Sequence, residues 1–372
     1  MHTICICTTV HQPWDGRIFE KEIKTLLLHF KVIYVAPEHH PYKEPLPENL
    51  NYRPLKKPRN RLLRFFRLAL VFKQLFALRN DVISYHVHDP ELTLVLALLK
   101  LTTGKRCFYD IHENSIAAIR DRFWIPAPLR AAFALTFQLI EKLCLPLFDA
   151  LICASVEIGE LYKNKNTIIL ENLPSRTFYE SIPNYDYKKP IILFAGALTK
   201  VRGIVQTVRA FIDANLPEEF QLLLLGWFES GELEREIIDM LTNSPKRDRF
   251  THHPFVPYYE SVRYIQESTI GIIPYLDYTN HRYGFPNKIF EFMASQTAII
   301  YNNLPNYRRV LADHDIGLCV DSSNIDNLSR AMETLAHDPE LRKRLGQNGR
   351  ALFLEKFNWQ HQAQLLVNLY KK

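Results

Sequence analysis

The sequence predicts an α/β protein built from two Rossmann-like domains, each a parallel sheet with helices on both faces. Three observations favour this fold. Short β-branched runs alternate with helical patterns along nearly the whole chain. The 372 residues suffice for two domains of the usual size of roughly 100–200 residues. A polar, proline-containing stretch at 174–190 separates two series of predicted strands and indicates the linker between the domains.

The first series of elements occupies the N-terminal half of the chain. Its predicted strands are Thr3–Thr8, Val32–Ala36, Val82–His86, Arg106–Ile111 and Ala150–Ala154. Helical patterns between them cover Ile18–Leu28 and Arg61–Phe76. This alternation is typical of parallel strands joined by crossover helices.

The second series follows the linker. Its predicted strands are Ile191–Ala195, Gln221–Leu225, Ile270–Pro274, Ala298–Tyr301 and Gly317–Val320. Asp338 followed by a proline is typical of a helix start, with the acid as N-cap. Asn358 is expected to cap a last helix, Trp359–Tyr370.

Composition narrows the class of protein. Hydrophobic residues make up 47% and charged residues 23%, which is ordinary for a globular protein. The formal net charge of +6 favours anionic partners but is too small to indicate nucleic acid. None of the six cysteines forms a Cys-x-x-Cys pair, which favours buried thiols in a reducing compartment. With no signal peptide and no apolar run of about 18 residues, we expect a cytoplasmic protein without a membrane span.

Polar residues that follow the predicted strands are the candidates for a functional site. In open parallel sheets, ligands bind beyond the carboxyl ends of the strands. A histidine at such a strand end can bind or polarise a substrate hydroxyl, although a structural histidine is the common alternative. The candidates at strand ends are Asp15, Arg17, His88, Asp89, His112 and Glu113 in the first series, and Gly196, Lys200 and Arg202 in the second.

The segment Arg282–Ala294 carries the sharpest signal. A loop with Gly284, Phe285 and Pro286 opens a helix at Asn287, which offers free backbone N–H groups to an anion. Lys288 adds a cation in the first turn, and Glu291 lies three residues later on the same helical face. A carboxylate one helical turn behind a phosphate site can accept hydrogen bonds from both hydroxyls of a ribose. A simple surface Lys–Glu pair would have the same spacing.

The sequence also contains candidate residues for a metal site and for a membrane surface. His86, His88 and Asp89 include ligand types for zinc, but no further ligand has suitable spacing, so we expect no metal. Asp313-His314-Asp315 falls in a predicted turn between a helix and a strand and is interpreted as turn chemistry. The basic amphipathic stretch 56–76 and the aromatic stretch 122–130 could contact an anionic membrane surface; packing of a helix on its own sheet is the alternative.

These motifs together resemble the retaining glycosyltransferases of family 4, which have the GT-B fold. The resemblance covers essentially the whole chain, and its most specific part is Pro286–Ala294. Other parts are Asp15–Ile18, His86–Asp89, Tyr109–Glu113, Phe194–Gly196 with Arg202-Gly203, and Phe357–Trp359. It implies two Rossmann-like domains facing across a cleft: an acceptor-binding domain 1–170, a donor-binding domain 171–357, and a C-terminal helix 358–372 that returns to the first domain.

The resemblance also implies a reaction. A sugar would pass from a UDP- or GDP-sugar to a saccharide or lipid-linked acceptor with retention of configuration, in polysaccharide or glycan assembly and without a metal. Glu291 would bind the ribose, Arg202 and Lys288 would lie near the diphosphate, and His112 would lie beside the transferred sugar. Peripheral binding to the inner face of the cell membrane would suit a lipid-linked acceptor.

Two positions depart from the family pattern. Tyr283 stands where the family often has a first glutamate that contacts the donor sugar, and Ala197 stands where it often has arginine. These departures leave two alternatives open: a nucleotide-sugar epimerase of the same fold, or a catalytically silent nucleotide-binding subunit of a synthase complex. The sequence does not indicate the donor base, the sugar, the acceptor, the linkage or the oligomeric state.

Overall fold

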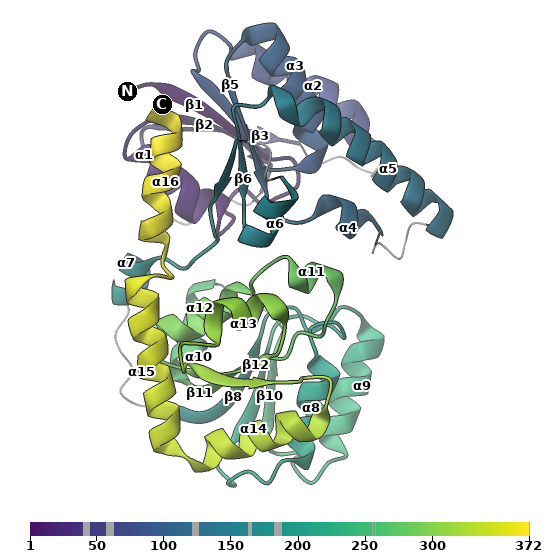
Figure 1. The fold of residues 1–372 in the computed structure, drawn as a ribbon, viewed down its shortest axis with the longest axis vertical. Helices are drawn as coiled ribbons and strands as arrows, with labels where there is room; N and C mark the ends of the chain where they lie inside the picture. The colour runs from purple at the N-terminus through teal and green to yellow at the C-terminus, as the bar shows by residue number, and fades with distance from the viewer. Residues whose placement is uncertain are drawn as a thin grey trace. The chain divides into compact units, whose positions relative to one another are not determined.

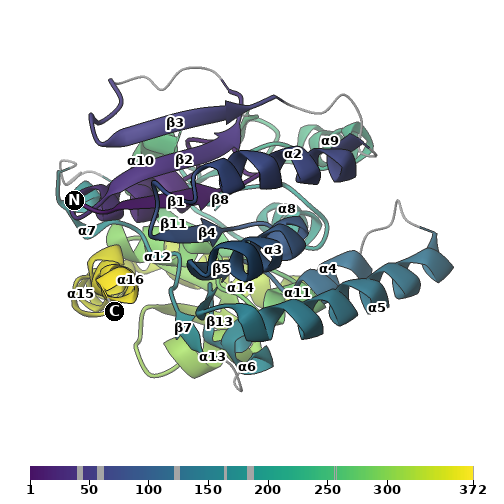
Figure 2. The ribbon, with the colours of Figure 1, turned by 90° about the horizontal axis from the view of Figure 1, so that it is seen from above.

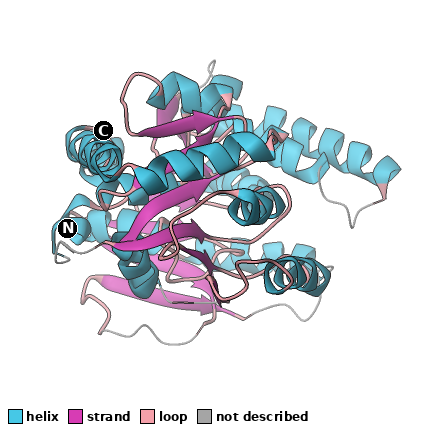
Figure 3. Ribbon diagram, turned by 90° about the horizontal axis from the view of Figure 1, so that it is seen from below, coloured by secondary structure: helices cyan, strands magenta, loops and turns pink. Residues whose placement is uncertain are grey.

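The structure is a computed structural model that describes residues 1–39, 45–56, 63–120, 126–162, 166–181, 188–254, 256 and 258–371. The chain forms two compact units (Figure 1). Unit 1 comprises Met1–Asn172 together with His361–Lys372, and unit 2 comprises Leu173–Gln360. Each unit contains one sheet, in which all neighbouring strands are parallel, with helices on its faces (Figure 3).

In the described part of unit 1 the sheet has seven strands in the order β3-β2-β1-β4-β5-β6-β7. The strands are β1 (Thr3–Cys7), β2 (Lys31–Pro37), β3 (Leu50–Leu55), β4 (Ser84–Val87), β5 (Arg106–Ile111), β6 (Ala150–Cys153) and β7 (Thr167–Ile169). The order reverses between β1 and β4, so the loops after these two strands meet at a topological switch point.

The helices of unit 1 include three that lie side by side. The α-helices are α1 (Lys24–Leu27), α2 (Leu63–Ala77), α3 (Thr93–Thr103), α4 (Ser115–Arg120), α5 (Ala127–Cys144), α6 (Val156–Leu161) and α16 (Trp359–Lys371). A π-helix, Ile18–Ile23, runs into α1, and short 3-10 turns cover Pro90–Leu92 and Leu145–Leu147. Helix α3 lies between α2 and α5 and contacts both (Figure 2).

In the described part of unit 2 the sheet has six strands in the order β10-β9-β8-β11-β12-β13. The strands are β8 (Lys189–Ala195), β9 (Gln221–Leu225), β10 (Phe250–His253), β11 (Ser268–Ile273), β12 (Ala298–Asn302) and β13 (Gly317–Val320). Its switch point lies between β8 and β11. The helices are α7 (Arg176–Ser181), α8 (Ile204–Asp213), α9 (Gly231–Thr242), α10 (Tyr258–Glu267), α11 (Thr279–Arg282), α12 (Asn287–Ala294), α13 (Pro305–Leu311), α14 (Ile325–His337) and α15 (Pro339–Glu355).

Both faces of the unit 2 sheet are buried, which explains why its strands are continuous apolar runs. Along β8, Phe194 packs on one face with helices α8, α9 and α14, and Leu193 packs on the other face with α10, α12, α13 and α15. Successive side chains of a strand point to opposite faces, so both must be apolar when helices cover both. This is the physical reason for the sequence pattern from which the fold was predicted.

The predicted α/β fold is confirmed, and ten strands lie where the sequence predicts them to within a few residues. The sequence missed β3, β7 and β10, which are short or have polar residues at alternate positions. The predicted linker also contains a helix, α7. Asp338 caps α15, because its side chain accepts from the Leu341 amide. Asn358 was wrongly expected to cap α16: its Nδ2 donates to the carbonyls of Phe353 and Leu354 at the end of α15.

Candidate functional site

In unit 2, the loop after β8 places a guanidinium beside the backbone. Gly196 has φ 126°, and a Cβ added there would lie 3.3 Å from Nη1 of Arg202. Gly203, at φ 78°, starts α8, and a Cβ there would lie 2.3 Å from the carbonyl oxygen of Pro274. Both glycines therefore allow approaches that a side chain would prevent. The loops after β8 and β11 meet here, and Arg202 lies at their junction.

The helix α12 contributes a second part of this site. It begins at Asn287, directly after Pro286, and Nζ of Lys288 lies 2.6 Å from Oε2 of Glu291. The Glu291 side chain is 6% exposed and that of Lys288 is 19% exposed. A surface pair would be far more open to solvent. The two side chains form a largely buried ion pair at the N-terminal end of the helix, where the helix dipole favours anions.

Tyr275 joins these two parts. It follows β11, and the Arg202 guanidinium lies over its ring, 5.2 Å from the centroid. Burial raises the pKa of Tyr275, the charge of Arg202 lowers it, and the charge of Glu291 raises it. Both charged groups thus act on the same buried ring. The arrangement brings together Arg202 from the loop after β8 with Tyr275 and Glu291 from the segment between β11 and β12.

The segment before α12 is held by specific contacts. Nδ2 of Asn306 donates to the carbonyls of His281 (3.0 Å) and Gly284 (2.9 Å). Nδ1 of His281 donates to the Leu276 carbonyl at 2.7 Å. Phe285 packs against Tyr307, with ring centroids 5.1 Å apart. These contacts fix the loop that leads to Asn287 and Lys288, which pre-organises the site for a ligand.

Lys200 is directed elsewhere. Its Nζ lies 3.0 Å from Oε2 of Glu236 on α9, and its side chain is 61% exposed. The hydrogen bond to Glu236 raises the pKa of Lys200. In this structure Arg202, rather than Lys200, supplies the positive charge next to Gly196.

In unit 1, a buried network of charged and polar groups lies beneath the switch point. The guanidinium of Arg17 donates to both carboxylate oxygens of Asp110 and, at 2.8 Å, to the Leu170 carbonyl. Its Nε also lies 2.9 Å from Oε1 of Glu22. Nδ1 of His88 lies 3.4 Å from Oδ2 of Asp110. All of these side chains are less than 5% exposed.

Burial and neighbouring charges fix the protonation states of this network. Burial would raise the pKa of Asp110, but Arg17 and the hydrogen bonds of the nearby histidines hold it well below its usual value. Burial and the charge of Asp110 raise the pKa of Glu22 well above its usual value. Burial lowers the pKa of His88 to about 4 despite its bond to Asp110. The ion pair Arg17–Asp110 therefore stands beside a neutral imidazole at neutral pH.

His112 lies at the solvent-accessible edge of the network. Its Nε2 is 3.2 Å from Nδ1 of His88 and 3.5 Å from Oδ1 of Asp110, and its side chain is 19% exposed. The ring of His11 lies beside it, with centroids 4.9 Å apart. Since Nε2 faces the buried carboxylate, the other ring nitrogen is the one oriented for a ligand. His112 can thus accept or donate a proton at a hydroxyl while Asp110 fixes its ring.

Two of the predicted site residues hold loops in place. Oδ2 of Asp89 accepts hydrogen bonds from the hydroxyl of Thr8 and from the backbone amides of Thr9 and Val10. Oδ1 of Asp15 accepts from the amides of residues 17 and 18 and starts the first helix. These acids are therefore occupied by the backbone of the loop after β1. Glu113, by contrast, is exposed and forms no ion pair within the described part of the chain.

The described residues contain one group with the ligand types of a metal site: Glu22, His86, His88 and Asp110, whose ligand atoms all lie within 4.8 Å of one another. All four are buried. The Arg17 guanidinium already lies against both carboxylates and supplies the positive charge that a metal would bring. A cation added there would face this guanidinium at short range, which is electrostatically unfavourable.

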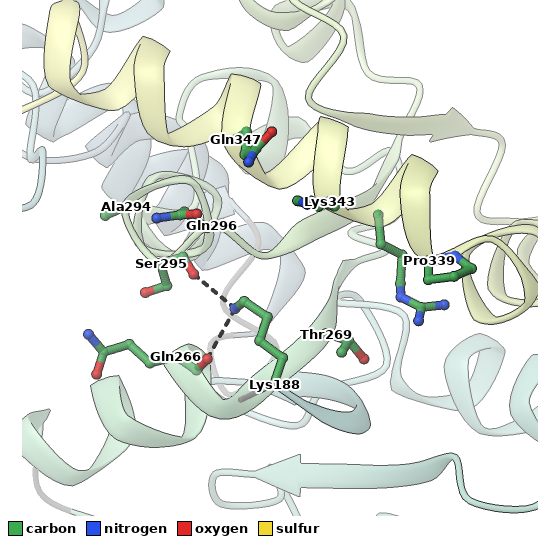
Figure 4. Close-up of a pocket in the computed structure, with 10 residues that line it drawn as sticks. Lys188, Gln266, Thr269, Ala294, Ser295, Gln296, Pro339, Lys343 and Gln347 are labelled. Carbon is green, nitrogen blue, oxygen red and sulfur yellow. Dashed lines mark hydrogen bonds between the residues drawn. The ribbon is translucent and has the colours of Figure 1, made fainter. Parts of the chain in front are cut away.

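A cavity of ≈ 470 Å³ lies at the opposite end of the unit 2 sheet (Figure 4). Lys188, Thr269 and Ser295 line it, near the amino ends of β8, β11 and β12. Nζ of Lys188 donates to the carbonyls of Gln266, Ser268 and Ser295 and to the Thr297 hydroxyl. Lys188 thus ties three strand starts together, and the cavity is separate from the strand-end site of Arg202 and Glu291.

Part of the chain is similar to a known protein family. Residues 175–352 match the family described as "Glycosyl transferases group 1". The matched range includes Gly196, Arg202, Tyr275, Lys288 and Glu291, so the candidate site of unit 2 lies wholly within it.

Curated relatives match about half of the chain. Alpha-maltose-1-phosphate synthase of Mycolicibacterium smegmatis is 24% identical over 195 residues, 50% of this chain and 49% of the relative. The capsular polysaccharide biosynthesis glycosyltransferase CapM of Staphylococcus aureus is 22% identical over 203 residues, 54% of this chain and 50% of CapM. The chain therefore spans about half the length of these curated relatives.

Solved structures match the whole chain and show its fold. Sucrose-phosphate synthase from Thermosynechococcus elongatus has a TM-score of 0.76 at 18% identity, covering 100% of this chain and 98% of that one. HepE of Anabaena, solved in complex with UDP, has a TM-score of 0.73 at 11% identity and covers 100% of both chains. The chain has the GT-B fold of these glycosyltransferases, as the sequence predicts. Within the described residues, no helix combines the length and apolarity that crossing a bilayer requires.

Sequence reasoning missed several residues of both sites. Tyr275 directly follows a predicted strand, so the strand-end rule that selected His112 could also have found it. Glu22 and Tyr370 had no such signal, because each lies within a helix pattern and reaches the network only through tertiary packing. Residues 57–62 and 122–125, part of the predicted membrane segments, lie outside the described residues.

Proposed function

We propose that the chain is a glycosyltransferase that moves a sugar from a UDP- or GDP-sugar to a saccharide or lipid-linked acceptor, with retention of configuration. The observation that carries this proposal is the buried pair Lys288–Glu291 at the start of α12, with Arg202 nearby at the same switch point. A nucleotide diphosphate needs cations for its phosphates and a carboxylate for its ribose hydroxyls. HepE, which was solved with UDP, supports the nucleotide part of the donor.

In this proposal unit 2 binds the donor. Arg202 and Lys288 neutralise the charge that develops on the diphosphate as the glycosidic bond breaks. Glu291 accepts hydrogen bonds from the ribose, and the backbone N–H groups of Asn287 and Lys288 face the phosphates. The positive charges of the chain perform the role that a divalent ion has in other enzymes, so we propose a reaction that needs no metal.

Unit 1 binds the acceptor. His112 contacts a substrate hydroxyl through the ring nitrogen that does not face Asp110, and the buried ion pair Arg17–Asp110 holds its orientation. The polysaccharide context of CapM supports a saccharide acceptor in glycan assembly. A cytoplasmic position at the membrane face, with the segments 56–76 and 122–130 near anionic lipid, completes the proposal; residues 57–62 and 122–125 of these segments lie outside the described residues.

The test is a donor screen followed by product analysis. Thermal shift with UDP, GDP and ADP and their sugars identifies the nucleotide, and calorimetry gives its affinity. We expect one nucleotide class to bind and its sugar to be transferred to an added saccharide acceptor. EDTA should leave the rate unchanged, and NMR of the product should show the donor's anomeric configuration.

Acceptor-free reactions separate the alternatives. Conversion of the donor to an epimer without any acceptor would replace the transferase proposal with an epimerase. Nucleotide binding without turnover over a broad acceptor panel would indicate a silent binding subunit. No binding of any nucleotide would contradict both the proposal and these alternatives.

A further inference from the structure

The outward sides of helices α3 and α5 expose large apolar side chains. On α3 these are Leu94, Leu98 and Leu101; on α5 they are Leu129, Phe133, Leu135, Leu139 and Leu143. We call these eight side chains the α3–α5 face. Their exposed fractions run from 46% at Leu94 to 75% at Leu143. Eight of the eighteen exposed large hydrophobic residues in the described chain thus lie on two helices.

The helical positions show that this exposure is a continuous stripe. On α5, Ala134, Glu141 and Cys144 are buried, while Leu139 and Leu143 project from the opposite side of the helix. Helix α5 therefore presents large apolar side chains on the side that faces away from the protein, where a surface helix normally carries polar residues.

The stripe of α5 continues onto its neighbours. Helix α3 contacts α5 on one side and α2 on the other (Figure 2). On α3, Leu94, Leu98 and Leu101 follow the spacing of one helix side. Leu70 of α2, at 67% exposure, extends the apolar surface to the third helix. Monomeric soluble proteins rarely leave such a contiguous apolar surface uncovered.

The charged residues around the α3–α5 face indicate which kind of partner covers it. Helices α2 and α5 present cations to solvent: Lys73 and Lys142 are exposed and Arg130 is half-buried, whereas Lys100 of α3 pairs with Asp149. The one acidic residue of the three helices, Glu141, is only 4% exposed. Leucines bordered by cations, with no exposed acid on the same helices, match an anionic lipid surface. In a two-fold dimer the same basic face would meet itself, and its charges would repel.

We propose that the α3–α5 face docks unit 1 on an anionic lipid bilayer. The leucines lie in the boundary between headgroups and acyl chains, and Lys73, Arg130 and Lys142 face the lipid phosphates. The helices rest on the membrane without crossing it. This proposal rests on the membrane position named in the proposed function and assigns the surface that makes the contact. None of the eight residues belongs to the candidate sites of either unit, so it does not depend on the transferase reaction.

Vesicle flotation of the full chain is the direct test. The two vesicle populations are phosphatidylcholine alone and phosphatidylcholine mixed with phosphatidylglycerol. We expect the protein to float with the mixed vesicles and to remain largely unbound with phosphatidylcholine. Flotation requires neither donor nor acceptor, so its result does not depend on whether the transferase proposal holds.

A pair of double variants locates the surface. Leu139→Gln with Leu143→Gln removes two exposed leucines of the face (53% and 75% exposed), and Leu28→Gln with Leu161→Gln removes two exposed leucines elsewhere in unit 1 (73% and 45%). We expect the first variant to bind mixed vesicles roughly tenfold or more weakly and the second to bind like the wild type. Circular dichroism and melting curves check that both variants are folded.

Three results would overturn the proposal. The wild type could fail to float with mixed vesicles. Both double variants could lose vesicle binding to the same extent, which would assign binding to general hydrophobicity. Finally, light scattering could show a dimer that the Leu139/Leu143 variant converts to a monomer while vesicle binding is absent, which would make the face a contact between two copies of the chain.

Discussion

The hydroxyl of Tyr370 lies 2.7 Å from Nδ1 of His86, and this bond joins helix α16 to the centre of the unit 1 sheet. Burial raises the pKa of Tyr370 well above its usual value, so the phenol keeps its proton and is neutral in this bond. The other ring nitrogen of His86, Nε2, faces Asp110 at 4.0 Å. A residue of the last helix thereby contacts a buried histidine beside the ion pair Arg17–Asp110.

Replacement of Tyr370 by phenylalanine should therefore destabilise the protein. Tyr370→Phe keeps the ring packing but leaves a buried nitrogen of His86 without its partner, which costs about 1–3 kcal/mol. Urea denaturation followed by fluorescence measures this loss. Tyr278→Phe, at a tyrosine that is 49% exposed, is the matched control and should change the free energy of unfolding by less than about 0.5 kcal/mol. Equal effects of the two variants would refute the role of the bond.

Removal of the Glu291 carboxylate should weaken nucleotide binding. Glu291→Ala eliminates the acceptor proposed for the ribose hydroxyls, and charge-assisted bonds of this kind are worth about 1.5–3 kcal/mol. We expect the dissociation constant of the nucleotide to rise at least about tenfold by calorimetry. Glu340→Ala, an exposed acid on α15, should bind like the wild type. Unchanged affinity of the Glu291 variant would remove this residue from the site.

Replacement of His112 should lower the turnover rate more than it lowers donor affinity or the stability of the fold. His112→Ala removes the group that contacts a substrate hydroxyl, so kcat should fall by roughly a hundredfold. The nucleotide dissociation constant should stay unchanged, because the donor residues belong to unit 2. Melting temperature should also change little, since the side chain is partly exposed. A large loss of stability with intact kcat would make His112 a structural residue only.

The low pKa of His88 predicts that acid destabilises the protein in a defined window. The folded state holds His88 neutral down to about pH 4, whereas the unfolded chain protonates it near pH 6.5. Protons therefore favour the unfolded state between these values, and stability falls as the pH drops through them. For His88 this loss amounts to about 3 kcal/mol.

Comparison with a variant isolates this effect from Glu22, whose raised pKa acts in the opposite direction. His88→Gln removes the titrating group, so the stability difference between wild type and variant should shrink as the pH falls from 7 to 4.5. Urea midpoints at three pH values measure it. A difference that is constant with pH would show that His88 does not titrate in this window.

Lys188 should be required for the stability of unit 2. Lys188→Met leaves three buried carbonyls without their donor, and we expect a loss of about 3 kcal/mol or more. Lys189→Met is a close control, because this neighbour is 57% exposed and its partner Glu267 keeps a second cation, Arg263. Its loss should stay below about 1 kcal/mol in the same urea titration. A mild effect at position 188 would mean that water replaces the ammonium group.

The strands and helices that could be predicted from the sequence are those with a clear hydrophobic pattern within a few consecutive residues. Most strands of unit 2 are apolar on both faces, and the predicted run Gln221–Leu225 matches β9 residue for residue. The Lys288–Glu291 pair was also predictable, because one helical turn fixes its geometry. Strand β3, with exposed residues at Asn51 and Pro54, lacks such a pattern at the edge of its sheet, and it was missed.

The remaining site residues depend on tertiary contacts that no spacing encodes. Arg17 was predicted as a strand-end residue, but its partners Glu22, Asp110 and Leu170 come from three different elements. The sequence spacing does not distinguish Lys200 from Arg202. Lys200 points away from Gly196 because it pairs with Glu236 on the neighbouring helix α9. Such choices arise from packing, which the sequence pattern does not record.

Helix α16 has a consequence for biogenesis. Residues 361–371 complete unit 1, yet the ribosome adds them only after all of Leu173–Gln360 has been made. Domains tend to fold as their residues are synthesised, and unit 2 is complete along the chain before unit 1 is. Unit 2 therefore has the opportunity to fold first, while His86 still lacks its partner. The nascent first unit therefore lacks part of its packing until Tyr370 emerges and binds.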